Sequence, residues 1–143
     1  IANNAWQYFQ PGAGVNAKTG LHQAGATFNY FTLWDLGVYI NAVLDAQDIG
    51  LISKGGTWGA DYRIEKIVNW LKTMTLGPKD VPYLWYNSNT GEPGIEYDDV
   101  ITNPYDYGCL LVSLNRLKWV FSDTRTDMEL FCCSFPIVCN KSK

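Results

Sequence analysis

Apolar side chains at helical spacing constrain this chain more than any other feature. The segments 35–47, 61–74 and 106–121 carry apolar residues three and four positions apart, so each presents one apolar helical face. A glycine follows the first segment and a Gly-Pro dipeptide the second, as expected at helix C-termini. A shorter helix is expected to end just before Pro11. The sequence therefore predicts an all-α fold.

The apolar stripes also predict which side chains form the core. They comprise Leu36, Tyr39, Ile40, Val43, Leu44, Ile64, Ile67, Val68, Leu71, Met74, Tyr107, Leu110, Leu111, Leu114, Leu117 and Phe121. Polar residues of the second segment lie off its stripe and are expected to face water. These are Arg63, Glu65, Lys66, Asn69 and Lys72.

Two long connections join the predicted helices. Residues 11–30 are rich in Gly, Ala, Asn and Thr, and residues 76–104 contain Gly, Pro and several acidic side chains. Loops of this length in compact domains are usually functional or disordered. We expect short β pieces near residues 81–86.

Two similar stretches, WDLG at 34–37 and YDYG at 105–108, stand where the second and fourth helices are expected to begin. Each contains an aromatic residue followed by Asp and, two positions later, Gly, and the two lie 71 residues apart (34 to 105). The recurrence predicts a repeated two-helix unit. Such units pack as hairpins or as part of an (α/α) toroid, with the long loops gathered on one rim.

The aspartates of these stretches, Asp35 and Asp106, have two interpretations. Each carboxylate can cap a helix that starts at the Asp itself. Alternatively, if the two helices run in the same direction, both carboxylates reach one rim beside Trp34 and Tyr105. Aromatic rings stack on sugar faces, and acids bind hydroxyls or catalyse glycosidic cleavage. Capping explains each Asp alone, but it leaves the aromatic partners unexplained.

Acidic side chains of the second long connection extend this candidate site. They are Glu92, Glu96, Asp98 and Asp99, for which a solvated acidic loop is the alternative interpretation. A glycosidase needs two carboxylates about 5–10 Å apart on opposite sides of the scissile bond. The candidate catalytic pair is therefore Asp35 with Asp106 or with one of the two glutamates.

Charge and composition narrow the classes of partner. The net charge is −3 and no run of Lys or Arg exists, so a nucleic-acid partner is not expected. No apolar run reaches transmembrane length, so a membrane span is not expected. The chain contains six Trp and nine Tyr, and we expect some of these rings at the surface, where they favour flat apolar ligands such as sugar faces. No cofactor is predicted.

The cysteines bear on compartment and on metal binding. They are Cys109, Cys132, Cys133 and Cys139. Two disulfides in an exported protein or a set of free buried thiols both fit this even number. His22 is the only histidine and the spacing lacks a second CxxC, so no zinc site is predicted. The chain begins with Ile1 rather than Met, and we expect a processed extracellular or cell-surface protein, or a fragment.

Several motifs together resemble the prokaryotic domain-of-unknown-function family 3131. They are AWQYF, KTGL, TLWDLGVYINAVLDAQDIGLIS, YNSNTGEP and YDYGCLLVSL, spread over about residues 2–119. The most specific are T-x-W-D-x-G at 32–37 and A-x-x-x-G-L-I at 46–52. That family is similar to glucoamylase-like (α/α) toroids, including those attached to cyclic glucan synthases.

The resemblance implies a partial toroid over residues 1–121 and a cysteine-containing tail, 122–143, packed on it. It implies that Trp34 and Asp35 lie on a sugar-facing rim below a loop at 18–20. A second rim loop would contain Tyr86, Asn87, Thr90 and Gly91, and Asp106 and Gly108 would repeat the helix-entrance pattern. Tyr86, Asn87, Trp34 and Tyr105 are thus the predicted glycan contacts, with a polysaccharide or oligosaccharide as the partner.

Family members are longer, so only about half a ring is expected here, and the tail with its three cysteines matches no part of the family that we identify. Three interpretations follow. The chain is a carbohydrate-active or glycan-binding domain, with or without catalysis. It is a self-assembling extracellular structural subunit, because an open ring exposes an apolar flank that a second copy can bury. It is a fragment of a longer glycoside hydrolase.

Overall fold

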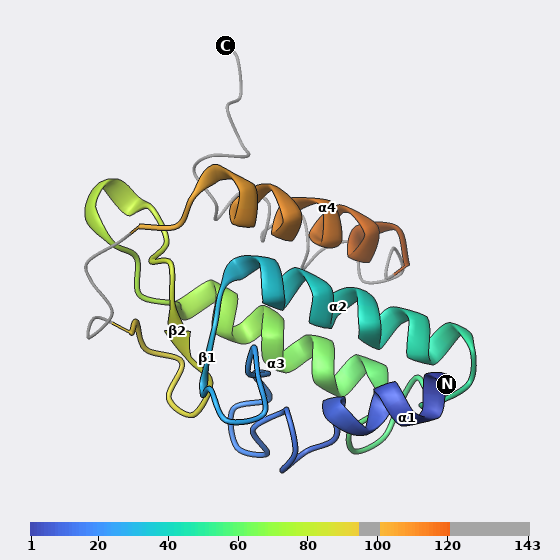
Figure 1. Cartoon of the computed structure of the whole chain (residues 1–143). Helices are drawn as coiled ribbons and strands as arrows, with labels where there is room; N and C mark the ends of the chain where they lie inside the picture. Colours follow the sequence, from blue (N-terminus) through green and yellow to red (C-terminus); the bar gives the residue numbers. More distant parts are fainter. Residues whose placement is uncertain (95–100, 121–143) are drawn as a thin grey trace.

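A computed structural model describes residues 1–94 and 101–120 of the chain. They form the helices α1 (Ala2–Trp6), α2 (Leu33–Asp48), α3 (Ala60–Thr73) and α4 (Pro104–Val120), with short 3₁₀ helices at Gln7–Phe9 and Pro78–Asp80. Strand β1 (Tyr30–Phe31) pairs antiparallel with β2 (Tyr86–Asn87). The prediction of a mainly helical chain is confirmed (Figure 1). Of the β pieces expected near residues 81–86, the structure has isolated bridges at Pro82 and Tyr83 and the start of β2 at Tyr86, whereas β1 begins in a predicted loop.

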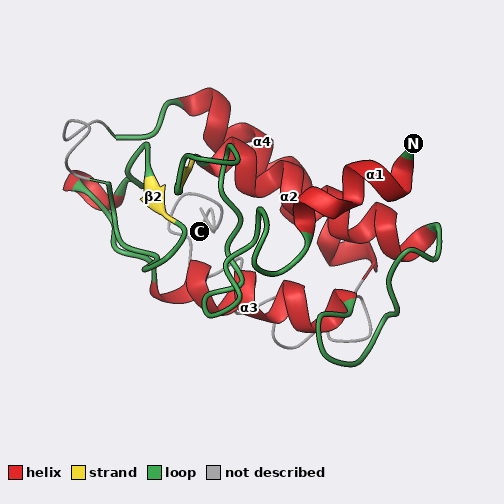
Figure 2. Cartoon of the chain, turned by 60° about the horizontal axis from the view of Figure 1, so that its bottom comes forward, coloured by secondary structure: helices red, strands yellow, loops and turns green. Residues whose placement is uncertain are grey.

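Helices α2 and α4 lie side by side and run in the same direction (Figure 1). Contacts follow one register along both helices: Trp34 stacks on Tyr105, Asn41 bonds to Ser113, and Arg116 pairs with Asp45. Helix α3 runs in the opposite direction beside α2, and the N-terminal loops lie on the side of α2 and α3 away from α4 (Figures 1 and 2). The two similar helix entrances therefore meet at one end of the helical layer.

The apolar stripe of α2 forms the centre of the core. The stripe residues from Leu36 to Leu44 are essentially inaccessible to solvent, as are Ile67, Leu110 and Leu117 from the two neighbouring helices. Burial of such side chains supplies most of the stability of a helical layer, at about 25 cal/mol per Å² of apolar surface. The core predicted from helical periodicity is therefore largely correct among the described residues, with Val68, Tyr107, Leu111 and Leu114 partly buried. Phe121 lies outside the described residues.

The predicted starts of α2 and α4 are wrong by two residues. The helices begin at Leu33 and Pro104 rather than at the aspartates. The residue before each start supplies the cap: the Asp35 amide donates to Thr32 Oγ1 (3.3 Å), and the Asp106 amide donates to Asn103 Oδ1 (2.9 Å). Thr and Asn are strong N-cap residues, and the N–H three positions on is their usual partner.

Gly37 allows α2 and α4 to approach closely. A Cβ atom at this position would lie 3.0 Å from Ser113 Oγ and 3.1 Å from the Cys109 carbonyl oxygen. Any larger residue would push the helices apart, because side chains at the contact set the distance between helix axes. The Gly of the WDLG stretch is therefore a helix-packing residue.

Arg63 contradicts the prediction that it faces water. Only 1% of its surface is exposed, although it lies off the apolar stripe of α3. Its guanidinium donates to the Trp58 carbonyl (2.8 Å), the Phe9 carbonyl (2.8 Å) and Tyr39 Oη (3.0 Å). The guanidinium carbon lies 5.0 Å from the ring centroid of Trp6 and 5.2 Å from that of Trp58. Cation–π contacts and these acceptors replace the water that the buried charge loses, so Arg63 ties the N-terminal segment to α3.

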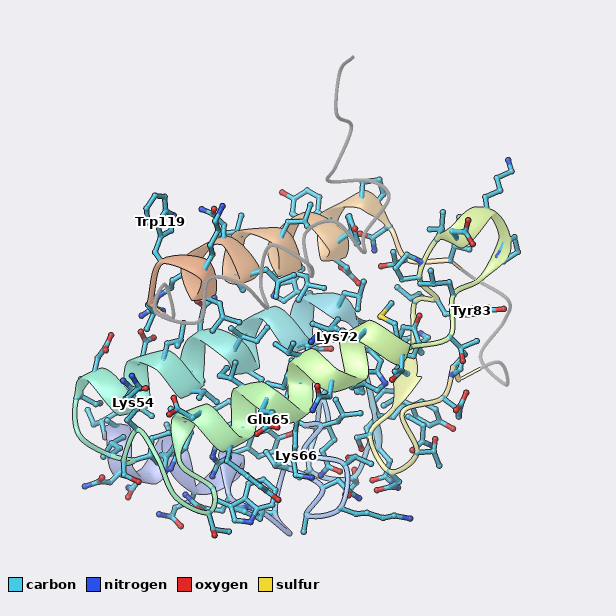
Figure 3. All side chains as sticks on the ribbon, turned by 180° about the vertical axis from the view of Figure 1, so that it is seen from behind. Lys54, Glu65, Lys66, Lys72, Tyr83 and Trp119 are labelled. Carbon is cyan, nitrogen blue, oxygen red and sulfur yellow. The ribbon has the colours of Figure 1, made fainter. Side chains whose placement is uncertain are left out.

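We expect the substitution Arg63→Met to lower the free energy of unfolding by about 2–4 kcal/mol. It removes the donors to three hydrogen-bond acceptors while roughly keeping the side-chain volume. Chemical denaturation measures this loss. Lys72→Met is the matched control, since Lys72 stands on the outer face of the same helix (Figure 3), and its effect should stay within about 0.5 kcal/mol. Equal effects of the two substitutions would contradict the structural role of Arg63.

Candidate functional site

The entrance of α2 is a capping box that engages the Asp35 carboxylate. Asp35 Oδ2 accepts hydrogen bonds from the Thr32 amide (2.9 Å) and the Thr32 hydroxyl (3.0 Å), while the Asp35 amide donates back to that hydroxyl. The carboxylate also lies in the first turn, where the helix dipole favours negative charge. Asp35 is half-buried, and its second oxygen takes no part in the box.

The entrance of α4 repeats this arrangement in part. Asn103 occupies the position of Thr32, and Asp106 occupies that of Asp35, 71 residues later in each case (32 to 103, 35 to 106). Asp106 is buried, in contrast to the half-buried Asp35. The two aspartates thus share a place in their helices but differ in their access to a ligand.

The aromatic residues of the two entrances stack on each other. The Trp34 and Tyr105 ring centroids are 6.0 Å apart and the ring planes differ by 19°. Both residues remain accessible, with 44% of Trp34 and 74% of Tyr105 exposed. Offset stacking at this separation is favourable, and it leaves ring surface open to solvent. The structure therefore brings together two of the three predicted aromatic glycan contacts, Trp34 and Tyr105.

An open groove of about 560 Å³ runs between α2 and α4 from this aromatic pair. Its walls are mainly apolar, and its polar side chains are Asn41 and Ser113. Asn41 Nδ2 donates to Ser113 Oγ (2.8 Å), and Arg116 donates to Asn41 Oδ1 (3.2 Å). The lining residues are Trp34, Gly37, Val38, Asn41, Pro104, Tyr105, Gly108, Cys109, Val112 and Ser113.

His22 lies beneath the Asp35 entrance, and the sequence carried no signal for this placement. The imidazole is buried and stacks on Tyr39 with centroids 5.1 Å apart. Its Nδ1 atom is buried without a hydrogen-bond partner. Burial lowers the pKa of His22 from 6.5 to about 4, although the negative charge of Asp35 acts in the opposite direction. The ring is therefore neutral at ordinary pH.

Tyr8 completes the surroundings of Asp35. Its hydroxyl donates to the Gln23 carbonyl (2.6 Å), which fixes the loop that carries His22. Burial and then the nearby Asp35 charge raise the pKa of Tyr8. This hydroxyl is thus a stable hydrogen-bond donor rather than a source of charge.

The two predicted rim loops meet each other, but neither lines the groove. Thr19 Oγ1 donates to the Ser88 carbonyl (2.6 Å), and Asn16 donates to Asn89 Oδ1 (2.7 Å). Both loops rest on α3, where Lys66 donates to the Lys18 carbonyl and Trp70 donates to the Gly91 carbonyl. The two loops gather together as expected, but they lie on α3 rather than over the Trp34–Tyr105 pair.

The other predicted site residues take structural positions. Tyr86 is fully buried, and its hydroxyl donates to the Thr75 carbonyl (2.8 Å), so it presents no surface to a ligand. Asn87 Oδ1 accepts from the Asn89 amide within the loop (2.8 Å). Glu92 is exposed and accepts from Thr75 Oγ1 (3.2 Å). Glu96, like Asp98 and Asp99, lies outside the described residues.

Cys109 is a free, half-buried thiol in the wall of the groove. The other three disulfide candidates, Cys132, Cys133 and Cys139, lie outside the described residues, as does the predicted tail at 122–143. Within residues 1–94 and 101–120, no cluster of three or more His, Cys, Asp or Glu side chains is arranged to hold a metal ion.

Residues 1–137 match the family described as "Protein of unknown function (DUF3131)". The chain belongs to this family. The match confirms the resemblance drawn from the helix-entrance motifs and extends it past residue 119, so that it includes Cys132 and Cys133. The prediction that the cysteine-containing tail lies outside the family is therefore wrong for residues up to 137.

Comparison with curated proteins gives no match, and neither does comparison with solved structures. In the part of the chain that the structure describes, none of the helices combines the length and apolar character needed to cross a bilayer.

The depressed pKa of His22 predicts a pH-dependent stability. The unfolded chain takes up a proton near pH 6.5, whereas the folded chain does so only near pH 4, so the free energy of unfolding falls as the pH drops through this window. The full difference corresponds to roughly 3 kcal/mol. Denaturant titrations of the wild type and of His22→Phe measure it. The variant should lose most of the decline between about pH 6.5 and pH 5, above the carboxylate range; an unchanged slope would refute the assignment.

Proposed function

We propose that this chain is a glycan-binding domain whose ligand contacts the Trp34–Tyr105 pair and the adjoining groove. The observation that carries the proposal is the pairing itself: two exposed, nearly parallel rings from segments 71 residues apart stand at the mouth of an open groove. Sugar rings present apolar C–H faces that pack on aromatic rings and hydroxyls that seek polar partners.

Polar groups beside the rings suit the hydroxyls of a sugar. Asp35 follows Trp34 at the α2 entrance without lining the groove, and the carboxylate oxygen that its capping box leaves unused can accept a hydrogen bond. Asn41 and Ser113 add further polar atoms along the groove wall. An open groove is the shape that accommodates part of a polymer rather than a small enclosed molecule.

We also propose that the helices form part of an (α/α) toroid. The support is the arrangement of the repeat: α2 and α4 are parallel neighbours with equivalent entrances, and α3 returns antiparallel between them in sequence (Figure 1). A repeated helix pair that places every second helix parallel generates such a ring when the pattern continues. The shared end of α2 and α4 would then form one rim.

Binding has more support than hydrolysis. Asp35 is committed to the capping box through one oxygen, and Asp106 is buried. Among the described residues no hydrogen bond links Glu92 to either aspartate, and Glu92 accepts a hydrogen bond from Thr75, two residues past the end of α3. A retaining or inverting mechanism needs two carboxylates facing one bond, so we assign these acids to binding and structure first.

Truncation of the paired rings tests the binding proposal. Trp34→Ala and Tyr105→Ala should each raise the dissociation constant for a bound glycan by about tenfold or more, equivalent to about 1.4 kcal/mol. Calorimetry against β-glucans and other polysaccharides first identifies the ligand and then measures the loss. Trp119→Ala is the matched control, because Trp119 is equally exposed on α4 but lies at the opposite end (Figure 3). Absence of any binding across the panel would refute the proposal, and equal losses in the control would refute the site.

Two substitutions at the α2 entrance separate capping from ligand contact. Asp35→Asn should lower stability by about 0.5–2 kcal/mol or less, since an amide oxygen can still accept from Thr32, but it should weaken glycan binding. Thr32→Ala should lower stability comparably or more, through loss of the cap, while glycan affinity stays unchanged. Thermal unfolding measures the stability of each variant, and calorimetry measures its glycan affinity. Unchanged affinity in Asp35→Asn would restrict Asp35 to its structural role.

A further inference from the structure

One face of α4 carries exposed apolar side chains along its length, with the polar residues Asn115 and Arg116 between the last two of them. Tyr105, Val112 and Trp119 expose 70% or more of their surfaces, and Trp119 projects away from the body of the molecule (Figure 3). Gly108 lies on the same face, and a Cβ atom built there would meet nothing within 4 Å. Large apolar side chains grouped on one helical face are typical of an interaction surface.

This face corresponds to the one that α2 turns toward α4. A shift of 71 residues converts Trp34, Gly37, Asn41 and Asp48 into Tyr105, Gly108, Val112 and Trp119. The four α2 residues all contact α4: Trp34 stacks on Tyr105, Gly37 meets Cys109 and Ser113, Asn41 bonds to Ser113, and Asp48 approaches Arg116. Helix α4 therefore presents to solvent the positions through which α2 binds its neighbour.

The complementary face is present on α2. The α4 residues that receive α2 are Cys109, Ser113 and Arg116, and the same shift places Val38, Ala42 and Asp45 in their positions. Val38 and Asp45 are exposed, and Ala42 is partly exposed. Small and aliphatic side chains here leave room for a helix that carries glycine at its contact point.

Charge supports the same register. Within one copy, Asp45 of α2 pairs with Arg116 of α4 at 2.6 Å. Because these two residues are equivalent under the repeat, docking α4 of one copy on α2 of the next brings Arg116 opposite Asp45 of the second copy. Opposite charges meet again, and the guanidinium has donors enough for two carboxylates.

We propose that copies of this chain associate head to tail, with the Gly108 face of α4 packed in parallel on the Val38 face of α2 in a second copy. Tyr105 then stacks on Trp34 of that copy, as Trp34 stacks on Tyr105 within one chain. Such an interface is heterologous, so it builds a ring if the rotation closes and a filament if it does not. The proposal goes beyond glycan binding, and the docked copy would cover part of the groove, because Val38, Tyr105 and Gly108 line it.

The substitution Gly108→Gln tests this interface without destabilising the monomer. Open space surrounds Gly108 in one chain, and Gln favours a helix more than Gly, so thermal stability should be kept or raised. Docking should be blocked, as a side chain at Gly37 would block α2 from α4. Sedimentation equilibrium from low micromolar to near millimolar concentration should show association of the wild type and a weakening of about tenfold or more in the variant. Asn69→Gln on the exposed face of α3 should associate like the wild type.

A mixing experiment distinguishes this interface from a symmetric one. Val38→Gln blocks the α2 face and Gly108→Gln blocks the α4 face, so each variant should be monomeric alone, whereas an equal mixture should form a dimer through the one intact pair of faces. A wild type that stays monomeric over the whole range, an unchanged oligomer in Gly108→Gln, or a mixture that fails to dimerise would overturn the proposal. Glycan binding by the wild type, at concentrations where sedimentation shows only the monomer, tests the proposed function separately, because Gly108 itself lines the groove.

Discussion

The close parallel contact of α2 and α4 at Gly37 is the constraint on which the rest of the structure depends. A missing side chain at this point brings α2 against the Cys109 backbone and Ser113. The same approach lets Asn41 reach Ser113 and Arg116 reach Asp45 further along. Well-packed helices transmit a displacement along their length, so a larger residue here would loosen every contact of the register.

That contact also creates the candidate site. It places two helix entrances side by side, and the residues before the two aspartates become a stacked aromatic pair at the end of a groove. The aspartates themselves belong to the capping of their helices, and they differ in burial. The proposed glycan site and the proposed head-to-tail interface use the same exposed side of the helical layer, because Tyr105 and Val112 both line the groove and belong to the exposed face of α4.

Sequence reasoning failed where interactions between distant segments override local pattern. Arg63 is polar and off its stripe, yet acceptors and rings from the N-terminal segment and the loop before α3 enclose it. His22 is buried by rings from several segments. The helix starts, in contrast, could have been predicted from the sequence, because Thr or Asn three residues before Asp is the pattern of an N-cap. Interpreting Asp as the cap placed each cap three residues too late and each helix start two residues too late.

The sequence by itself determined the helices, most of their buried stripes and the recurrence of the two entrances, because helical periodicity and capping act between residues a few positions apart. It also determined membership of the family. Only the tertiary structure decided that Trp34 and Tyr105 share one site, that Tyr86 is enclosed, and that the loop at 18–20 rests on α3. These outcomes depend on how far apart two helices come to rest, and a single glycine sets that distance through its packing against residues more than 70 positions away.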